Sequence, residues 1–306
     1  VVKVNVADGG EGTMDVLQQT LGGRKVTLSV ADPLGRPVQA SYVILEDAIT
    51  AVLEMSAASG LPLLTPEERN PSMTSTLGTG ELICDALAQG CRKFLVGIGG
   101  SATNDAGMGM LHALGYRFLD ADGAELPPVG GSMIRVASID MSSRNLVLDD
   151  AKFIVACDVK APLYGPEGAA YVFAPQKGAD KEMVEALDQG LRHFAAVSSQ
   201  TAGFDSSLLE GSGAAGGLGY AFRQFLGARL ERGVEMVLDA IHFDEIITGS
   251  DLVITGEGRV DNQTLTGKTP FGVAQHALRQ GIPVVAIGGS VIIDPSQAQE
   301  AGFKDV

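Results

Sequence analysis

The sequence predicts an α/β protein, because buried-strand patterns alternate with helical patterns along the chain. Apolar runs rich in Val, Ile and Leu end at or just before Gly or Asp in the segments 93–98, 153–158, 251–255 and 283–287. Such runs are typical of parallel strands that are covered on both faces of a sheet. Helical patterns flank or separate several of them, at 80–90, 103–114 and 269–280. The length of 306 residues favours two domains.

Two segments of a different character interrupt this alternation. Residues 26–52 carry turn residues at 32–35, and residues 116–131 carry Asp122-Gly123. Both patterns predict antiparallel hairpins. We therefore expect a domain with a doubly wound parallel sheet and a second, inserted domain of mixed α+β type. The predicted ranges are 66–115 plus 236–306 for the first and 1–65 plus 116–235 for the second.

The charge of the chain excludes several classes of partner. A formal net charge of −15, with 22 Lys and Arg residues in all, argues against a broad surface for nucleic acid or for an anionic membrane. No apolar run approaches the roughly 18 residues of a membrane-spanning helix, and the start does not resemble a signal peptide. The three Cys and four His residues show no disulfide framework and no metal-ligand spacing. We expect a cytoplasmic protein.

The segment 93–107, KFLVGIGGSATNDAG, leads from a predicted strand through glycines to residues that favour the start of a helix. At such a turn, unpaired backbone N–H groups and the helix dipole attract negative charge. We expect an anion to bind here. The residues predicted to contact it are Gly99, Gly100, Ser101, Thr103, Asn104 and Asp105.

The same turn allows two other interpretations. Gly97, Gly99 and Ala102 fit the spacing G-x-G-x-x-A, and Asp120 lies about where a dinucleotide fingerprint has its acidic residue. An NAD(P)-dependent oxidoreductase of small hydroxy acids is therefore an alternative, although Asp120 leads into a hairpin rather than ending a parallel strand. The glycines could also serve only to bring a helix and a strand close together.

Glycine-rich segments follow other predicted strands as well. Ile-Gly-Gly-Ser recurs at 287–290, and Gly-Glu-Gly occupies 256–258. In doubly wound sheets, the turns that follow parallel strands meet at the carboxyl edge, where ligands bind. We expect these segments to form turns at one such edge.

Further polar clusters look like parts of the same site. The segment 7–13, ADGGEGT, is expected to follow a short strand, and it can bring backbone and carboxylates close to a ligand or a metal ion. A carboxylate at the end of the strand 153–158 and a Lys in a Gln-Lys-Gly turn suit proton transfer and phosphate binding. The segment 210–222 is either a glycine-rich ligand loop or a close-packed helix start. The candidate residues of these clusters are Asp8, Gly9, Gly10, Glu11, Asp158, Lys177, Glu257, Arg259, Asp261, Gln263, Thr264 and Lys268.

These motifs together resemble the bacterial glycerate kinase family. The resemblance rests on ADGGEGT at 7–13, TSTLGTGELI at 74–83, GIGGSATNDAG at 97–107, PLYGPEGAA at 162–170, APQKGA at 174–179, GSGAAGGLG at 211–219 and TGEGRVDNQTLTGK at 255–268. The matches occur in order across nearly the whole chain. The family usually starts with an additional strand and an Asp-Ser-Phe-Lys-Gly-Ser-like loop, so we expect these to precede residue 1.

The resemblance implies ATP-dependent phosphorylation of D-glycerate, with 2-phosphoglycerate as the favoured product and Mg²⁺ accompanying ATP. It also implies a flavodoxin-like domain and a restriction-endonuclease-like domain with the site between them. The glycine turn within 93–107 would then bind a nucleotide phosphate or the glycerate carboxylate. A sensor that binds small acids without catalysis is a further alternative, and monomer and homodimer both stay open.

The chemistry of phosphoryl transfer guides the choice of roles. A hydroxyl attacks the γ-phosphorus in line, a carboxylate accepts its proton, and cations absorb the developing charge. We expect Asp158, Asp261 and Lys268 to be catalytic, with Asp158 as the general base. Asp8 or Asp261 is expected near Mg²⁺. Lys177, Arg259 and Lys268 are the expected phosphate and carboxylate contacts.

Overall fold

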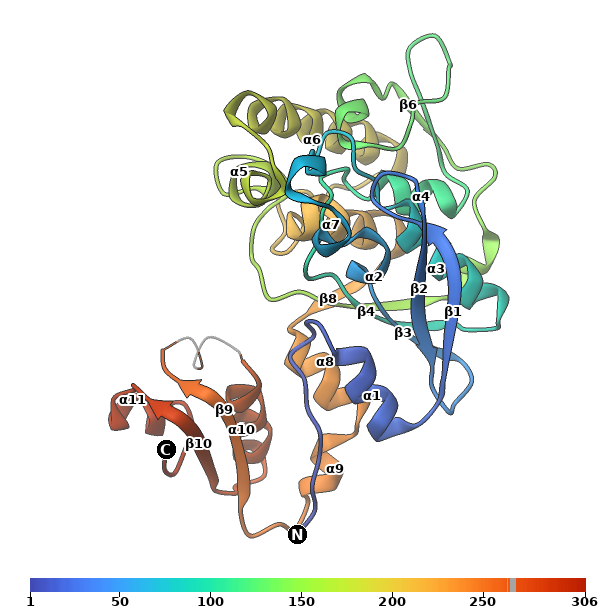
Figure 1. The fold of residues 1–306 in the computed structure, drawn as a ribbon. Helices are drawn as coiled ribbons and strands as arrows, with labels where there is room; N and C mark the ends of the chain where they lie inside the picture. The colour runs from blue at the N-terminus through green and yellow to red at the C-terminus, as the bar shows by residue number, and fades with distance from the viewer. Residues whose placement is uncertain (263, 265–267) are drawn as a thin grey trace.

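The computed structural model describes residues 1–262, 264 and 268–306 (Figure 1). Its main sheet has six strands in the order β1-β2-β3-β4-β7-β8. They are β1 (Arg24–Ala31), β2 (Pro37–Ile44), β3 (Thr50–Glu54), β4 (Lys93–Gly97), β7 (Lys152–Ala156) and β8 (Arg229–Glu231). β2 runs antiparallel to both of its neighbours, β1 and β3, whereas β3, β4, β7 and β8 run parallel. The predicted α/β class is therefore confirmed, with a sheet that is mixed rather than wholly parallel.

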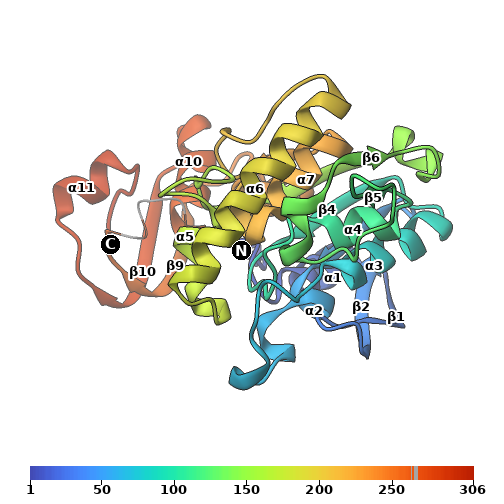
Figure 2. The ribbon, with the colours of Figure 1, turned by 90° about the horizontal axis from the view of Figure 1, so that it is seen from above.

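Two smaller sheets complete the strands. β9 (Val253–Val260) and β10 (Val284–Val291) pair in parallel, and β5 (Arg117–Leu119) pairs antiparallel with β6 (Ser138–Asp140). β9 and β10 lie apart from the six-stranded sheet in Figures 1 and 2. We call residues 253–306 the small lobe and residues 13–231 the large lobe.

Helices cover both faces of the main sheet. They are α1 (Thr13–Leu21), α2 (Ser56–Ser59), α3 (Leu77–Ala88), α4 (Met108–Ala113), α5 (Ala169–Phe173), α6 (Lys181–Ala202), α7 (Ala214–Leu226), α8 (Gly233–Ala240), α9 (Phe243–Ile247), α10 (Thr269–Arg279) and α11 (Pro295–Glu300). Among the described residues, no helix combines the length and the apolar character needed to cross a membrane.

The alternation of side chains along the central strands divides the core in two. In β4, Phe94 and Val96 belong to a core shared with α3, α4, α6 and α7, whereas Leu95 faces a second core. That second core contains α1, α8, α9 and α10 and reaches Val253 and Val284 of the small lobe. Because both faces are buried, the strand sequence is continuously apolar. The helices α1 and α8 thus lie between the main sheet and the small lobe (Figure 1).

Several predictions about local structure are confirmed. The 26–52 segment forms the β1–β2 hairpin, with Gly35 in the left-handed region at φ +81°. Around Asp122-Gly123 the chain turns back, and Leu119 bridges Glu125 in antiparallel fashion. The helix at 269–280 is α10.

Other predictions are wrong in instructive ways. The glycine-rich segments 256–258 and 287–290 continue the strands β9 and β10 instead of forming turns, because their backbones pair with each other in register. Residues 1–8 form neither helix nor strand, and α4 begins at Met108 rather than at 103. β4 lies between β3 and β7, although the predicted domain division groups it with β9 and β10. The boundaries of the two domains stay a prediction.

Candidate functional site

The loop 8–12 lies against the carboxyl ends of the central strands and the start of α8. A Cβ atom on Gly233 would lie 1.8 Å from the carbonyl oxygen of Asp8, and one on Gly9 would lie 2.6 Å from the Cβ of Ala156. Gly9 also has a left-handed φ of +83°. Any side chain at Gly9 or Gly233 would force these segments apart. The two glycines therefore fix Asp8 beside the end of β7.

Asp158 follows β7 and comes close to Asp8. Its Oδ1 accepts a hydrogen bond from the N–H of Gly233 at 3.2 Å. The side chain is exposed at the wall of the cleft, yet the surrounding protein atoms desolvate it enough to raise the pKa of its carboxyl, and the charge of Asp8 raises it further. The hydrogen bond from Gly233 opposes this rise. A carboxylate whose pKa is moved toward neutrality is suited to accept a proton.

Lys177 is the most unusual cation of the large lobe, because its side chain is only 1% exposed. Its Nζ donates to Oγ of Ser101 at 2.6 Å and to the carbonyl oxygen of Thr103 at 2.7 Å. Burial lowers the pKa of this ammonium to about 7, although the charge of Asp105 acts in the opposite direction. Both recorded hydrogen-bond partners are neutral oxygens. The sequence suggested a lysine held by a turn, and gave no sign that it is buried.

A cavity of about 470 Å³ connects these groups. The predicted site residues that line it are Asp8, Gly9, Gly10, Gly99, Gly100, Ser101, Asp158 and Lys177. The turn after β4 and the loop 8–12 thus share one hollow with the two carboxylates and the buried lysine, as the sequence predicted for this part of the site.

A second cavity of about 470 Å³ lies on the small-lobe side of Asp8. Asp8 lines it together with Glu257 of β9 and with Lys268, Thr269 and Pro270 at the start of α10. Lys268 Nζ lies 3.7 Å from Oε2 of Glu257. Unpaired N–H groups at the N-terminus of an eleven-residue helix, next to a lysine, favour an anion. Asp8 therefore lines two neighbouring cavities, one that contains Lys177 and one that contains Lys268.

The charged residues at the end of β9 and just after it are paired with their neighbours. Arg259 Nε lies 3.0 Å from Oδ2 of Asp261, and the hydroxyl of Thr264 accepts from the N–H of Asp261 and donates to Glu257. None of Arg259, Asp261 and Thr264 lines either of these two cavities. Gln263, which the sequence places in the same cluster, lies outside the described residues.

The residues 103–105 lie behind the cavity wall. Asp105 is completely buried and accepts four hydrogen bonds, from N–H and Oγ1–H of Thr76 and from the N–H groups of Gly107 and Gly109. These bonds do not prevent burial from raising the pKa of the carboxyl. The hydroxyl of Thr103 and the amide of Asn104 are also buried, and they have no hydrogen-bond partner within the described part of the chain.

Glu54, at the end of β3, is a site residue that the sequence analysis missed. It lines a third cavity of about 450 Å³ with Glu11, and this cavity shares Gly9, Gly10, Gly99 and Gly100 with the first. Its Oε1 accepts from the N–H of Met14 at 2.9 Å, and burial raises the pKa of its carboxyl. Glu54 pairs with Gly97 in the sheet register, so a prediction that placed 50–54 beside 93–97 could have found it.

A metal ion at this site would have to be bound by few protein side chains. Within residues 1–262, 264 and 268–306, no group of three or more His, Cys, Asp or Glu side chains has an arrangement that could hold a metal ion. Asp8 lines the first cavity with Asp158 and the second with Glu257, so each cavity offers a pair of carboxylates. Mg²⁺ usually binds through one or two carboxylates plus the phosphate oxygens of a substrate, and the residues present fit that requirement.

The region around Asp120 does not provide a dinucleotide site. The carboxylate of Asp120 accepts from the N–H groups of Asp122 and Ala124 inside its own turn. The preceding strand β5 pairs antiparallel with β6 and belongs to a separate two-stranded sheet. The acidic residue of a dinucleotide fingerprint ends a parallel strand next to the first one.

Comparisons with known proteins agree with the sequence motifs. A model of the glycerate kinase family matches residues 1–306. The chain is 49% identical to a glycerate kinase of Bacillus subtilis (strain 168), covering 98% of this chain and 79% of the relative. It is 45% identical to a glycerate 2-kinase of Escherichia coli (strain K12), covering 100% and 80%.

A solved crystal structure has the same fold. It is that of a Salmonella typhimurium LT2 protein with the provisional name glycerate kinase 2, and it superposes with a TM-score of 0.90 at 44% identity, covering 98% of this chain and 84% of that one. The family model, the relatives and the fold agree over nearly the whole length. The chain belongs to the glycerate kinase family.

Proposed function

We propose that this protein transfers the γ-phosphoryl group of ATP to a hydroxyl of D-glycerate and that the product is 2-phosphoglycerate. The single observation that carries the proposal is the position of Asp8 between two cavities, one with Asp158 and Lys177 and one with Lys268. Two anionic substrates need two cation-bearing sites that share a wall, because the reacting atoms must approach to about 3 Å. The name of the Escherichia coli relative supports carbon 2 as the position that is phosphorylated.

D-Glycerate would bind in the cavity of the large lobe. Its carboxylate would face Lys177 and the 99–101 turn, since these residues line that cavity and carry N–H groups that can donate to an anion. Its reacting hydroxyl would face Asp158. The hydroxyl oxygen forms a bond to the γ-phosphorus, the bond from phosphorus to the β-phosphate oxygen breaks, ADP leaves, and the hydroxyl proton passes to Asp158.

The phosphates of ATP would bind on the small-lobe side of Asp8. Lys268 and the N-terminus of α10 line that cavity, but the ammonium of Lys268 lies beside Glu257. Phosphate binding would therefore require Lys268 to change partner. Mg²⁺ bound with the nucleotide would supply positive charge to the phosphates, and Asp8 and Glu257 are the carboxylates that would approach it.

Local cations are necessary because the protein as a whole is acidic. A formal charge of −15 repels glycerate and ATP at long range, although physiological salt screens this repulsion beyond about 8 Å. Lys177, Lys268 and Arg259 would reverse the potential where the anions bind. Arg259 would have to leave Asp261 to take part, since these side chains form an ion pair.

We extend the proposal to the domains, the location and the role of Asp261. A flavodoxin-like domain and a restriction-endonuclease-like domain, a cytoplasmic location, and Asp261 as a catalytic or magnesium-binding residue follow only from the family resemblance or from the sequence. Thr103, Asn104 and Asp105 do not line the first cavity, and they would act by supporting the residues that do. The buried amide of Asn104 has no hydrogen-bond partner among the described residues, which favours a ligand or a water that reaches it, because buried polar atoms are usually satisfied.

The experiment that tests the proposal is an ADP-release assay with Mg²⁺-ATP over a panel of hydroxy acids. We expect D-glycerate to give a rate far above the rate without acceptor. Phosphorus NMR of the product then distinguishes 2-phosphoglycerate from 3-phosphoglycerate. ADP release that no hydroxy acid stimulates would contradict the kinase. Ligand-dependent melting with glycerate and without ADP release would favour the sensor, and quenching of NADH fluorescence would favour the oxidoreductase.

A further inference from the structure

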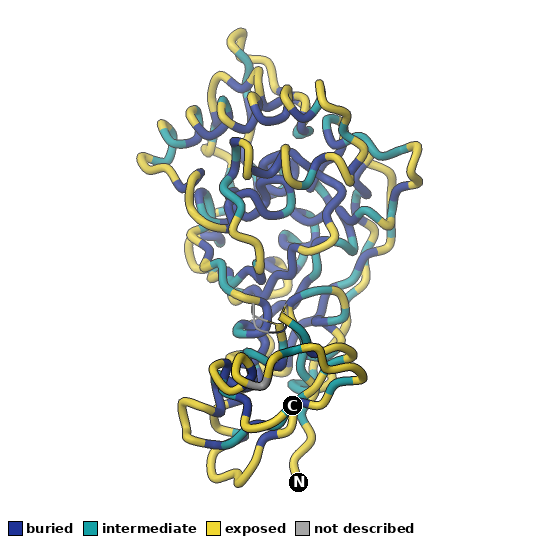
Figure 3. Tube along the Cα trace, turned by 90° about the vertical axis from the view of Figure 1, so that its left-hand side faces the viewer, coloured by how far each residue is buried: buried dark blue, intermediate teal, exposed yellow. Residues whose placement is uncertain are grey.

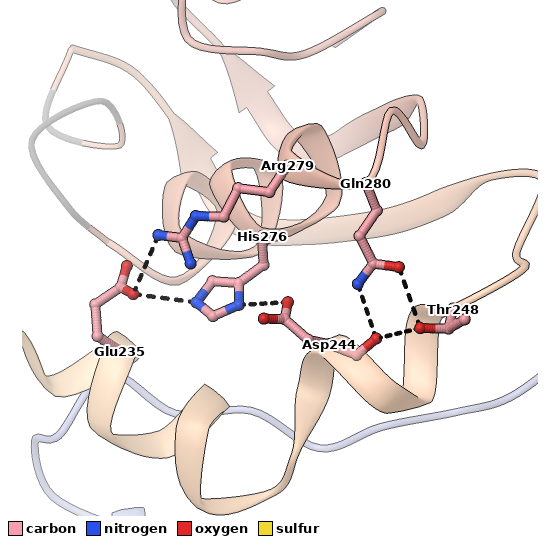
Figure 4. Close-up of polar contacts among 6 residues, drawn as sticks. All are labelled: Glu235, Asp244, Thr248, His276, Arg279 and Gln280. Carbon is pink, nitrogen blue, oxygen red and sulfur yellow. Dashed lines mark hydrogen bonds and ion pairs between the residues drawn. The ribbon is translucent and has the colours of Figure 1, made fainter.

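His276 lies in the last turns of α10, in contact with both α8 and α9 (Figure 4). Its Nδ1 lies 2.8 Å from Oδ1 of Asp244 in α9, and its Nε2 lies 3.0 Å from Oε2 of Glu235 in α8. The histidine is only 2% exposed, and its ring meets that of Phe243 edge-on at 6.0 Å. The imidazole thus bridges two acidic side chains from two different helices.

The contacts of His276 with Asp244 and Glu235 involve charged carboxylates. Both ring nitrogens of His276 lie within hydrogen-bond distance of a carboxylate oxygen, so at least one ring N–H donates to a carboxylate in either tautomer. Hydrogen bonds between charged groups are stronger than neutral ones, more so when water is excluded. Arg279 lies 3.9 Å from the same Glu235 oxygen and adds positive charge on the open side of the cluster.

A second contact fastens the end of the same helix. Gln280 Nε2 donates to the carbonyl oxygen of Asp244 at 2.8 Å, and the hydroxyl of Thr248 donates to this carbonyl as well. Near the other end of α10, a Cβ atom on Gly272 would lie 2.6 Å from Cγ2 of Val234, so α10 and α8 are already in close contact there. α10 is therefore fixed against α8 and α9 along its length.

Helix α8, which His276 connects to its own helix α10, contacts residues that line the first cavity, and the start of α10 lines the second. The first residue of α8, Gly233, donates to Asp158 and packs against Asp8, and Glu235 lies only two residues further on. The first turn of α10 lines the other cavity next to Lys268. A movement of α10 on α8 would change the position of Lys268 relative to Asp8 and Asp158.

We propose that His276 is a positioning residue that holds α10 on α8 and α9 and thereby sets the position of the small-lobe phosphate site relative to the Asp8–Asp158 pair. The proposal rests on the proposed function for its effect on catalysis. This role requires no contact between His276 and a substrate, and His276 lines none of the cavities described above.

The test separates binding from alignment. In His276→Gln each half of the cleft keeps its own residues, so the dissociation constants of D-glycerate and of a non-hydrolysable ATP analogue, measured separately by calorimetry, should stay within about threefold. The kcat should fall roughly 10- to 100-fold, the scale expected when reacting atoms are misplaced by about 1 Å. The matched control is His193→Gln, which removes a histidine that contacts the carbonyl oxygen of Val136 in the large lobe, and it should leave kcat unchanged.

Hydrogen exchange gives a readout that does not depend on activity. Amides of α10 and β9 should exchange faster in His276→Gln, whereas those of α6 should not. Asp244→Asn keeps the ring and removes one charge, so it serves as a second variant and should give a smaller change in the same direction. If His276→Gln folds with unchanged kcat and unchanged exchange in α10, the inference is wrong. An inactive parent protein with faster exchange in the variant would instead reject the proposed function and leave the positioning role supported.

Discussion

Lys177 of the large lobe and Lys268 of the small lobe line neighbouring cavities in opposite electrostatic situations. Lys177 is buried and donates to two neutral oxygens, whereas the side chain of Lys268 is 44% exposed and lies beside the carboxylate of Glu257. Within the described residues no carboxylate forms an ion pair with Lys177, so an anion that reaches its ammonium displaces no carboxylate. An anion that reaches Lys268 must compete with Glu257. The comparison suggests that the large lobe is preorganised for its ligand and that the small lobe exchanges partners when its ligand binds.

The two lobes also differ in how far their residues are buried. The large lobe surrounds its site with buried polar groups, including Asp105 with four donors, while many residues of the small lobe are exposed (Figure 3). Preorganised groups act strongly because they need no rearrangement during the reaction. Changes in the large-lobe site should therefore affect catalysis and acceptor binding, and changes in the small lobe should affect the nucleotide.

The largest effect is expected for Asp158→Asn. The amide cannot accept the hydroxyl proton, so kcat should fall by about 10²- to 10⁴-fold while D-glycerate still binds. Steady-state kinetics and calorimetry measure the two quantities. Asp120→Asn is the matched control, because this carboxylate only bonds within its own turn. A kcat within about twofold of the parent would remove Asp158 from the role of base.

A smaller effect is expected for Lys268→Met. Loss of one partly exposed phosphate contact should raise KM for ATP roughly 10-fold, with little change in KM for D-glycerate. Lys304→Met removes an exposed lysine elsewhere in the small lobe and should change neither value. If Lys268→Met weakened D-glycerate more than ATP, the assignment of the two ligands to the two cavities would have to be reversed.

The pH dependence of acceptor binding sharpens the comparison. The pKa of Lys177 is lowered from 10.5 to about 7, so the charged form is present below pH 7 and is lost as the pH rises. The affinity for D-glycerate should therefore decrease up to about tenfold per pH unit above 7, since binding selects the protonated form. Calorimetry between pH 6 and pH 9 measures it, and an affinity independent of pH would contradict a charged contact at Lys177.

The lowered pKa of Lys177 also affects the stability of the fold, which depends on pH in the opposite direction to acceptor binding. Between about pH 7 and pH 10.5 the unfolded chain binds the Lys177 proton and the folded chain does not. The contribution of this group to the free energy of unfolding therefore rises with pH over that window. The difference in melting temperature between the parent and Lys177→Met should change across this range, and a constant difference would argue against the lowered pKa.

The smallest effect on activity is expected for Asp105→Asn. The carboxylate is already used by four donors behind the cavity wall, so its loss should act on stability rather than on substrates. We expect the free energy of unfolding to fall by about 1–3 kcal/mol, because an amide cannot accept all of these bonds. Denaturant unfolding measures it. Loss of kcat without loss of stability would return Asp105 to the binding site.

The sequence predicted those parts of the site that depend on local pattern. The turn 99–101, the loop 8–10, Asp158 and Lys177 were all identified, and the structure gathers them around one cavity. These residues sit directly after strands or inside glycine turns, where spacing alone indicates exposure of the backbone. The helix at 269–280 was also predicted, and α10 begins at Thr269.

The parts that the sequence could not predict depend on contacts between distant segments. The burial of Lys177 arises from packing against Ser101 and Thr103, which lie more than 70 residues away. Glu54 joins the site through its pairing with Gly97, and the carboxylate of Asp105 is taken by Thr76. The segments 256–258 and 287–290 looked like turns, but mutual parallel pairing extended both strands through their glycines.

The most direct measurement is the affinity of the Lys177→Met variant for D-glycerate, determined by calorimetry at pH 6.5. Methionine fills a similar space without a charge, so the variant should fold, because removing a buried charge offsets the loss of the two hydrogen bonds to Ser101 and Thr103. We predict that D-glycerate binds on the order of 100-fold more weakly and that the ATP analogue binds as before. Unchanged binding of D-glycerate to a folded variant would contradict the account.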